Sequence, residues 1–243
     1  MQDKKSPGTA TNNLMGETMK NAFGLVIFLT LLGTLTGYAN PQELENEHAA
    51  EKIVYVNATL VYSQWVAFPY PNGFVEAYEK DNGSVYIKES VLSGETIKEW
   101  SQMITLIGHK LLAKNPTVTP QLILSMLAKR YQQGCPDTFT SKGLGSFITN
   151  GHEAFVVFLG CGTVQNMPPA SPWNQREETV IIAIKGSSDY YTIQWAERGP
   201  KIDHAPVFDE AKWMNRITQL KPIKICDRVP NESSPSPSCL NQK

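Results

Sequence analysis

Histidine and cysteine are scarce in this chain, and their spacing excludes several kinds of site. There are four residues of each type among 243. The sequence has no CxxC pair, no HExxH motif, no G-x-S-x-G elbow and no phosphate-binding glycine loop. We therefore expect no metal, no cofactor and no catalytic residues of a familiar class.

Net charge is also nearly absent. The chain has 22 basic and 23 acidic residues, which gives a formal charge of −1. Proteins that bind nucleic acid favour a basic stripe, so we expect no nucleic acid partner. The hydrophobic content of 41% and charged content of 19% describe a globular protein with a somewhat charge-poor surface.

The N-terminal region has the anatomy of a secretory signal peptide. Lys20 precedes an apolar run at 22–37, and Gly37 and Ala39 supply small residues at the −3 and −1 positions of a cleavage site. The alternative is a membrane anchor, but the run is shorter than the roughly 20 residues of a spanning helix. We expect residues 1–39 to be an N-terminal extension and a cleaved signal, with no stable membrane span afterwards.

Export gives the four cysteines a structural interpretation. An even number of cysteines in an exported chain indicates disulfides, and a periplasmic or secreted location permits them. Three pairings are possible, and we favour Cys135–Cys161 and Cys226–Cys239 because each joins sequence neighbours. The second pair would close a loop rich in Pro and Ser that has too few apolar residues to anchor itself by burial.

The remaining pattern predicts an α+β fold, mainly an antiparallel sheet flanked by helices. A polar lead-in is expected at 40–52, a single domain at 53–228, and a Pro/Ser-rich tail at 229–243 tethered by Cys239. Asn82-Gly83 is typical of a hairpin turn. Runs of β-branched and aromatic residues predict strands at 53–68, 74–78, 85–92, 103–107, 153–160, 179–185 and 190–197; the last two form a second hairpin.

Two helices are predicted from their caps and spacing. Thr119 is an N-cap followed by Pro120, and Gly134 marks the end of this helix. Its apolar residues recur at helical spacing, which predicts a core face made of Leu122, Ile123, Met126, Leu127 and Tyr131. A second helix at 209–220 is expected to present three residues to the core, namely Trp213, Ile217 and Leu220.

Residues 93–107 are the most distinctive stretch of the chain. Thr96 and Glu99 match a capping box, in which the Glu99 carboxylate would reach back to the Thr96 amide. We expect one turn of helix here, with Trp100 packed against the core, followed by a switch to a strand near Ser101.

Five short motifs are spread along the chain. They are GETxxxWxxMIT at 94–105, Cys135-Pro136, Cys161, IKGSSDYY at 184–191, and KICD at 224–227 with a second cysteine downstream. Together they resemble a family of uncharacterised exported proteins of Gram-negative bacteria. The helix-to-strand stretch also resembles the PsbP-like fold, which implies an α/β/α sandwich but no chemistry. One departure is Gly160-Cys161-Gly162 in place of Arg-Cys-Pro.

Four residues are candidates for contact with a partner: Glu95 near a helix N-terminus, Trp100, His109 at a strand end, and Trp173 in a Pro-rich loop. We expect a non-catalytic binding or interaction module of the periplasm or the secreted fraction, with an unknown protein or small-molecule partner. One alternative is a host-facing secreted factor. Another is a hydrolase with an unrecognised site that involves His109, Glu95 and Ser101.

Overall fold

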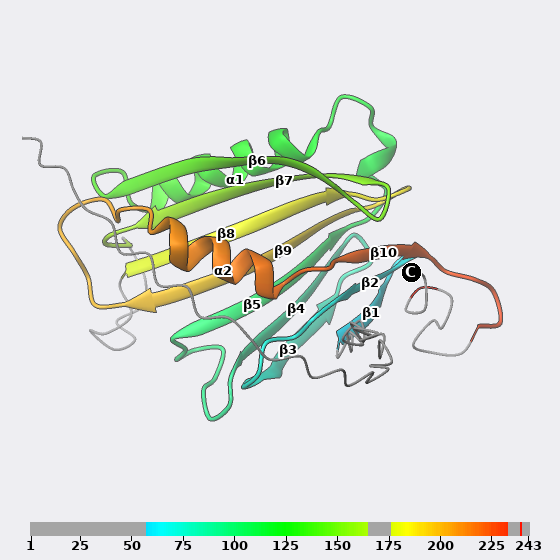
Figure 1. Cartoon of the computed structure of the whole chain (residues 1–243), viewed down its shortest axis with the longest axis horizontal. Helices are drawn as coiled ribbons and strands as arrows, with labels where there is room; N and C mark the ends of the chain where they lie inside the picture. The colour runs from blue at the N-terminus through cyan, green and yellow to red at the C-terminus, as the bar shows by residue number, and fades with distance from the viewer. Residues whose placement is uncertain (1–56, 165–175, 233–238, 240–243) are drawn as a thin grey trace, which may run out of the picture. The chain divides into compact units, whose positions relative to one another are not determined.

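Two antiparallel sheets and two α-helices make up the part of the chain that the computed structural model describes, which is residues 57–164, 176–232 and 239 (Figure 1). The α+β class is therefore as the sequence predicts. The expected signal peptide, the polar lead-in and Trp173 lie outside the described residues, and the domain boundaries stay predictions. None of the helices in the described ranges is long and apolar enough to cross a membrane.

The larger sheet has seven strands in the order β3-β4-β5-β9-β8-β7-β6. These are β3 (Phe74–Asp81), β4 (Val85–Leu92), β5 (Gln102–His109), β6 (Phe139–Thr149), β7 (His152–Cys161), β8 (Arg176–Lys185) and β9 (Tyr190–Gly199). The two predicted hairpins are confirmed, because β3 pairs with β4 across Asn82-Gly83 and β8 pairs with β9.

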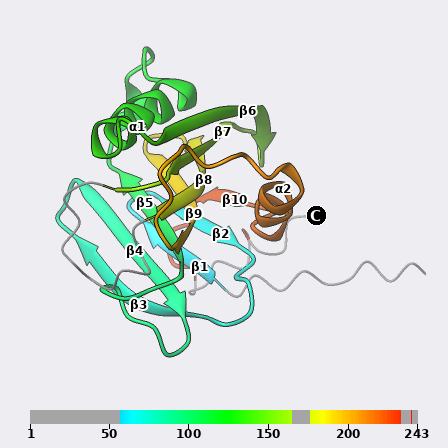
Figure 2. The same ribbon diagram turned by 90° about the vertical axis from the view of Figure 1, so that its left-hand side faces the viewer.

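A smaller sheet has three strands in the order β1-β2-β10. They are β1 (Asn57–Val61), β2 (Gln64–Phe68) and β10 (Lys224–Asp227). This sheet lies on the same side of the larger sheet as α2 (Figure 2). Its apolar side chains join the main core cluster, as Val61, Val66 and Ile225 show.

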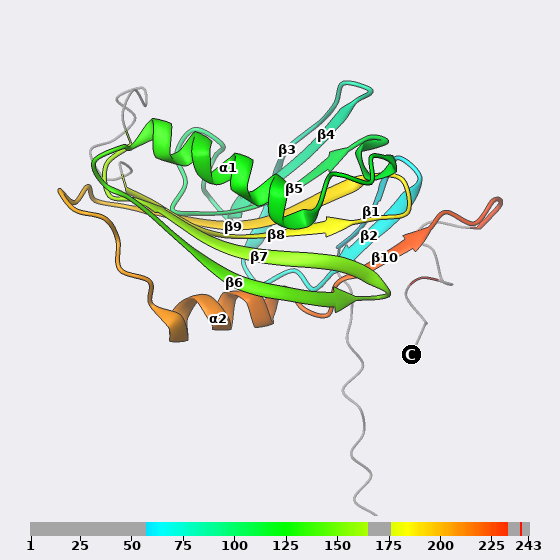
Figure 3. The ribbon, with the colours of Figure 1, turned by 90° about the horizontal axis from the view of Figure 1, so that it is seen from above.

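The two helices cover opposite faces of the larger sheet (Figure 3). Successive residues of a strand point to opposite faces, so each strand can feed two cores. On one face Leu124 of α1 (Pro120–Gly134) packs with Val157, Leu159, Ile181 and Ala183. On the other face α2 (Glu210–Gln219) contributes Trp213 and Ile217 to a cluster with Phe158, Val180 and Ile182. The α/β/α sandwich and the PsbP-like fold remain predictions.

The predicted core face of α1 is partly wrong. The Thr119 side chain accepts a hydrogen bond from the Leu122 amide, as an N-cap should. However, Leu122 and Met126 are 43% and 54% exposed, and Leu124 is the buried leucine. The spacing of apolar residues on this helix allows two faces, and contact with β7 and β8 selects the one that contains Leu124. In α2 the prediction is confirmed, because Trp213, Ile217 and Leu220 are all buried.

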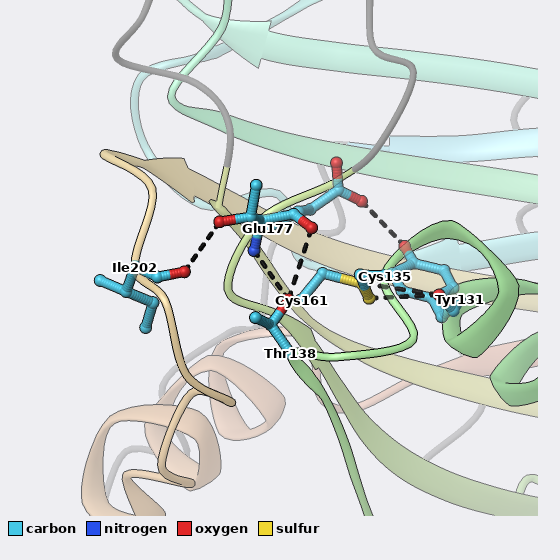
Figure 4. Close-up of a disulfide and its surroundings, with 7 residues drawn as sticks. Tyr131, Cys135, Thr138, Cys161, Glu177 and Ile202 are labelled. Atoms are coloured by element: carbon cyan, nitrogen blue, oxygen red, sulfur yellow. Dashed lines mark hydrogen bonds between the residues drawn. A yellow bond between two sulfur atoms is a disulfide. The ribbon is translucent and has the colours of Figure 1, made fainter.

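Both favoured disulfides are present. Cys135, the C-cap of α1, is bonded to Cys161 at the end of β7 (Figure 4). Cys226 of β10 is bonded to Cys239. The departure at Gly162 has a steric reason, because a Cβ atom at this position would collide with the carbonyl oxygen of His204.

Candidate functional site

The stretch around Thr96 forms a bend, so the predicted turn of helix is wrong. The Thr96 hydroxyl accepts from the Glu99 amide at 3.2 Å, which is half of the capping box. The Thr96 amide donates to the Glu99 carbonyl at 3.0 Å and not to its carboxylate. Since the Glu99 amide also donates to the Thr96 carbonyl, the backbone closes on itself and no i→i−4 ladder forms.

Glu95 and Trp100 both have structural roles at this bend. The Glu95 carboxylate accepts hydrogen bonds from the Ser101 amide at 3.0 Å and from the Ser101 hydroxyl. Trp100 is 5% exposed and packs with Val91, Met103 and Ala196. The Arg198 guanidinium lies 3.8 Å from the centre of the Trp100 ring. The ring is therefore held in the core, with the Arg198 guanidinium over one of its faces.

His109 lies at the opposite end of β5 from these residues. Glu95 is bonded to Ser101 just before β5 begins, whereas His109 is its last residue. At roughly 3.3 Å per residue the strand separates them by about 25 Å. The structure does not bring together His109, Glu95 and Ser101, so these three cannot form one hydrolytic site. Burial lowers the pKa of His109, and the charge of Arg130 lowers it further.

The segment that follows His109 lines part of a pocket with a volume of about 380 Å³. Three segments build it: the β1–β2 turn, the segment after β5 that contains the short helix η1 (Leu112–Lys114), and the β8–β9 turn. These segments lie at the same end of the sheets (Figure 3). The lining residues are Tyr62, Ser63, Lys110, Leu111, Lys114, Ser188 and Asp189. We call this the Asp189 pocket.

One buried carboxylate holds the three segments together. Asp189 is 1% exposed. Its carboxylate accepts from the Ser63 hydroxyl at 2.6 Å, the Ser63 amide at 3.3 Å and the Leu111 amide at 2.6 Å. The Tyr191 hydroxyl oxygen lies 3.4 Å from it. The three hydrogen bonds from Ser63 and Leu111 satisfy the charge, which explains how it is tolerated in the interior.

The same carboxylate fixes two strained residues. Tyr62 has φ of 57° and Leu111 has φ of 60°, the left-handed region that bulky side chains avoid. Each such residue costs on the order of 1–3 kcal/mol and persists only where its surroundings enforce it. The Asp189 bonds to the Leu111 amide and to the residue after Tyr62 supply that enforcement. Strain of this kind is typical of ligand clamps.

The pocket presents hydrogen-bond donors to a ligand. Burial and the nearby Asp81 carboxylate raise the pKa of Tyr62 to about 12, and its hydroxyl donates to that carboxylate at 3.4 Å rather than to the pocket. The Lys110 ammonium lies 5.5 Å from the centre of the Tyr62 ring. Among the described residues, neither Lys110 nor Lys114 has a carboxylate within ion-pair distance. Because the Asp189 carboxylate already accepts three hydrogen bonds, Lys110 and Lys114 supply the charged groups of the lining that a ligand can contact.

A second hydrogen-bond network, centred on Gln64, joins the β1–β2 turn and the β8–β9 turn next to the residues that line the pocket. The buried Gln64 amide donates to Asp227 at 2.8 Å and to the Ser187 hydroxyl at 3.1 Å. The Gln64 side-chain oxygen accepts from the Ser187 amide at 3.0 Å. The Tyr191 hydroxyl lies 3.3 Å from this oxygen and 3.3 Å from the Val61 carbonyl oxygen, and it can donate its one proton to either. The motifs at 184–191 and 224–227 are thus neighbours in the fold, although about 40 residues separate them in sequence.

The sequence carried little signal for this site. His109 stands directly before Lys110, so the prediction came close in position but chose a residue that does not line the pocket. The turn at Tyr62-Ser63 contains no Gly, Asn, Asp or Pro, and Ser63 is its one residue of a type common in turns. In the described part of the chain, no group of three His, Cys, Asp or Glu side chains could hold a metal ion.

Comparisons with known proteins leave the chain without a family. No protein-family model matches it. No curated protein sequence matches it either. Among solved structures it is similar to LpqN, involved in cell envelope biogenesis of Mycobacterium tuberculosis, with 6% identity and a TM-score of 0.35. It is also similar to the Ran-binding protein Mog1p of Saccharomyces cerevisiae, with 10% identity and a TM-score of 0.36.

Each of these two similarities covers 68% of this chain and 84% of the other. TM-scores of this size are too low to carry an argument about fold or function.

Proposed function

We propose that this chain is an exported, disulfide-stabilised binding module without catalytic activity of its own, which works in the periplasm or outside the cell. Two disulfides suit an oxidising compartment, where such bonds persist. The apolar run at 22–37 and the small residues that follow it supply the export signal.

The observation that carries the binding role is the strained Asp189 pocket. Two residues in the left-handed region cost stability, and a single buried carboxylate enforces both of them. A turn selected for stability alone would place Gly or Asn at such positions. The ligand is expected to present a hydrogen-bond acceptor or an anionic group to Lys110 and Lys114.

Affinity capture with matched baits tests this role. The full chain carries a tag at its C-terminus and is exposed to envelope and secreted fractions, with bound proteins and small molecules identified by mass spectrometry. The three baits are the wild type, a Lys110→Gln/Lys114→Gln double variant, and Lys129→Gln on the exposed surface of α1. We expect wild type and Lys129→Gln to retain the same partner and the double variant to lose it.

Identical capture by all three baits, or repeated capture of nothing, would overturn the role of the Asp189 pocket. Circular dichroism of each bait controls for folding. The export part is tested separately by N-terminal sequencing of the protein recovered from the periplasm or medium, which should begin at Asn40.

A further inference from the structure

The edge of the larger sheet that β6 forms is a different kind of surface from the Asp189 pocket. β6 is the last strand in the sheet order, and within the described residues it pairs with β7 alone. Figure 1 shows it as the outermost strand of the sheet. An edge strand leaves backbone N–H and C=O groups unpaired along its outer side, and another extended chain can pair with them.

The two edges of this sheet are protected very differently. β3, at the other edge, carries four charged residues, namely Glu76, Glu79, Lys80 and Asp81. Charges of this kind prevent unwanted strand pairing. β6 has eleven residues and one charged residue, Lys142, whose ammonium lies 4.2 Å from the centre of the Phe208 ring and 3.9 Å from the Glu210 carboxylate. A bulge between Gly143 and Gly145 also interrupts β6, and a bulge of this kind blunts an edge locally. The part of β6 beyond the bulge, residues 146–149, has no charged residue and no bulge, so it is the part open to strand addition.

An apolar groove lies beside this part of β6. It has a volume of about 410 Å³ and lies between the start of α1 and the β6–β7 hairpin. Ile148 of β6 lines it and is 67% exposed, and the half-buried Phe155 ring lines it from β7. Strand addition along β6 would place alternate side chains of the incoming chain on this face of the sheet.

The one charged residue of the groove indicates which side chain an occupant would carry there. Glu153 is the one charged side chain that lines it, and Glu153 is exposed. Among the described residues no cationic group lies within ion-pair distance of its carboxylate. An occupant that complements this groove carries a basic side chain opposite Glu153 and an apolar side chain beside Ile148.

We propose that β6 binds an extended segment of a partner polypeptide as an added strand, with an apolar residue in the groove and a basic residue beside Glu153. This surface is distinct from the Asp189 pocket, since the two share no lining residue. The backbone of β6 supplies affinity for any extended chain, and the groove supplies the preference for sequence.

The probe is a phage-displayed library of random nine-residue peptides, selected on the full wild-type chain. Enriched peptides should combine apolar alternation with a Lys or Arg. Their affinity should fall about tenfold or more for Ile148→Ser, because the exposed Ile side chain that the bound peptide would cover is replaced by a polar one. It should fall severalfold for Glu153→Gln. The matched controls Met126→Ser, on the outer side of α1, and Glu99→Gln should bind as wild type does.

A peptide with N-methylated backbone amides distinguishes strand addition from contact by side chains alone. This peptide should lose at least tenfold in affinity, and the unmodified peptide should slow amide hydrogen exchange in β6. Failure to enrich any peptide, equal binding by the Ile148→Ser variant, or equal binding of the N-methylated peptide would each overturn the proposal. Self-association of the free protein that is lost in Ile148→Ser would overturn it too, because a second copy would then occupy the edge.

Discussion

At the scale of single residues, Asp189 does more than any other side chain to shape the candidate pocket. Asp189→Asn keeps the size of the side chain but replaces one acceptor oxygen by a donor that faces other donors. Since hydrogen bonds to a charged acceptor contribute about 1.5–3 kcal/mol each, we expect the free energy of unfolding to fall by about 3 kcal/mol. Urea unfolding measures this, with the exposed Asp137→Asn as control. A loss within error of that control would contradict the role of Asp189.

His109 predicts a dependence of stability on pH. Burial and Arg130 hold its pKa below the ordinary value of 6.5, so the unfolded state takes up the proton first as the pH falls. The free energy of unfolding therefore declines below pH 6.5 and levels off once the pH is below the lowered pKa. His109→Gln should reduce this decline between pH 7.5 and 5 in urea titrations. Equal slopes for the wild type and the variant would refute this.

At the scale of elements, the bend before β5 depends on Trp100. The ring packs with Val91 and Met103, and the Arg198 guanidinium covers it. Trp100→Ala should lower the free energy of unfolding by about 3–5 kcal/mol, as other truncations of buried aromatic residues do. The control is Val75→Ala on the exposed edge strand β3, which should cost far less. A near-neutral Trp100→Ala in urea unfolding would mean that the ring is free to contact a partner.

Elements with a strong local pattern were predictable, and those whose backbone is fixed by distant groups were not. β8 and β9 are long apolar runs around a Ser-Ser-Asp turn, so the hairpin was visible in the sequence. β6 was not predicted because Gly143 and Gly145 interrupt it at a bulge and few of its residues are β-branched. The Asp189 pocket was also missed, because its carboxylate acts on Ser63 across 126 residues.

At the scale of the whole molecule, the two disulfides make stability depend on the compartment. Cys226–Cys239 spans 13 residues and Cys135–Cys161 spans 26, which in the chain-entropy model contribute about 3 and about 3.5 kcal/mol. Their sum is a large part of the 5–15 kcal/mol that stabilises an ordinary domain. A reducing environment would therefore remove a large part of the stability of the fold.

Reduction tests this dependence directly. Full reduction, verified by thiol alkylation, should lower the melting temperature by about 15 °C, because each kcal/mol shifts a domain of this size by about 2–4 °C. A Cys226→Ser/Cys239→Ser double variant should lose roughly half of that, since it keeps the longer loop closed. Calorimetry with and without reductant measures both shifts. An unchanged melting temperature after verified reduction would show that the core alone stabilises the fold. The stability of the protein would then not depend on whether its surroundings are oxidising or reducing.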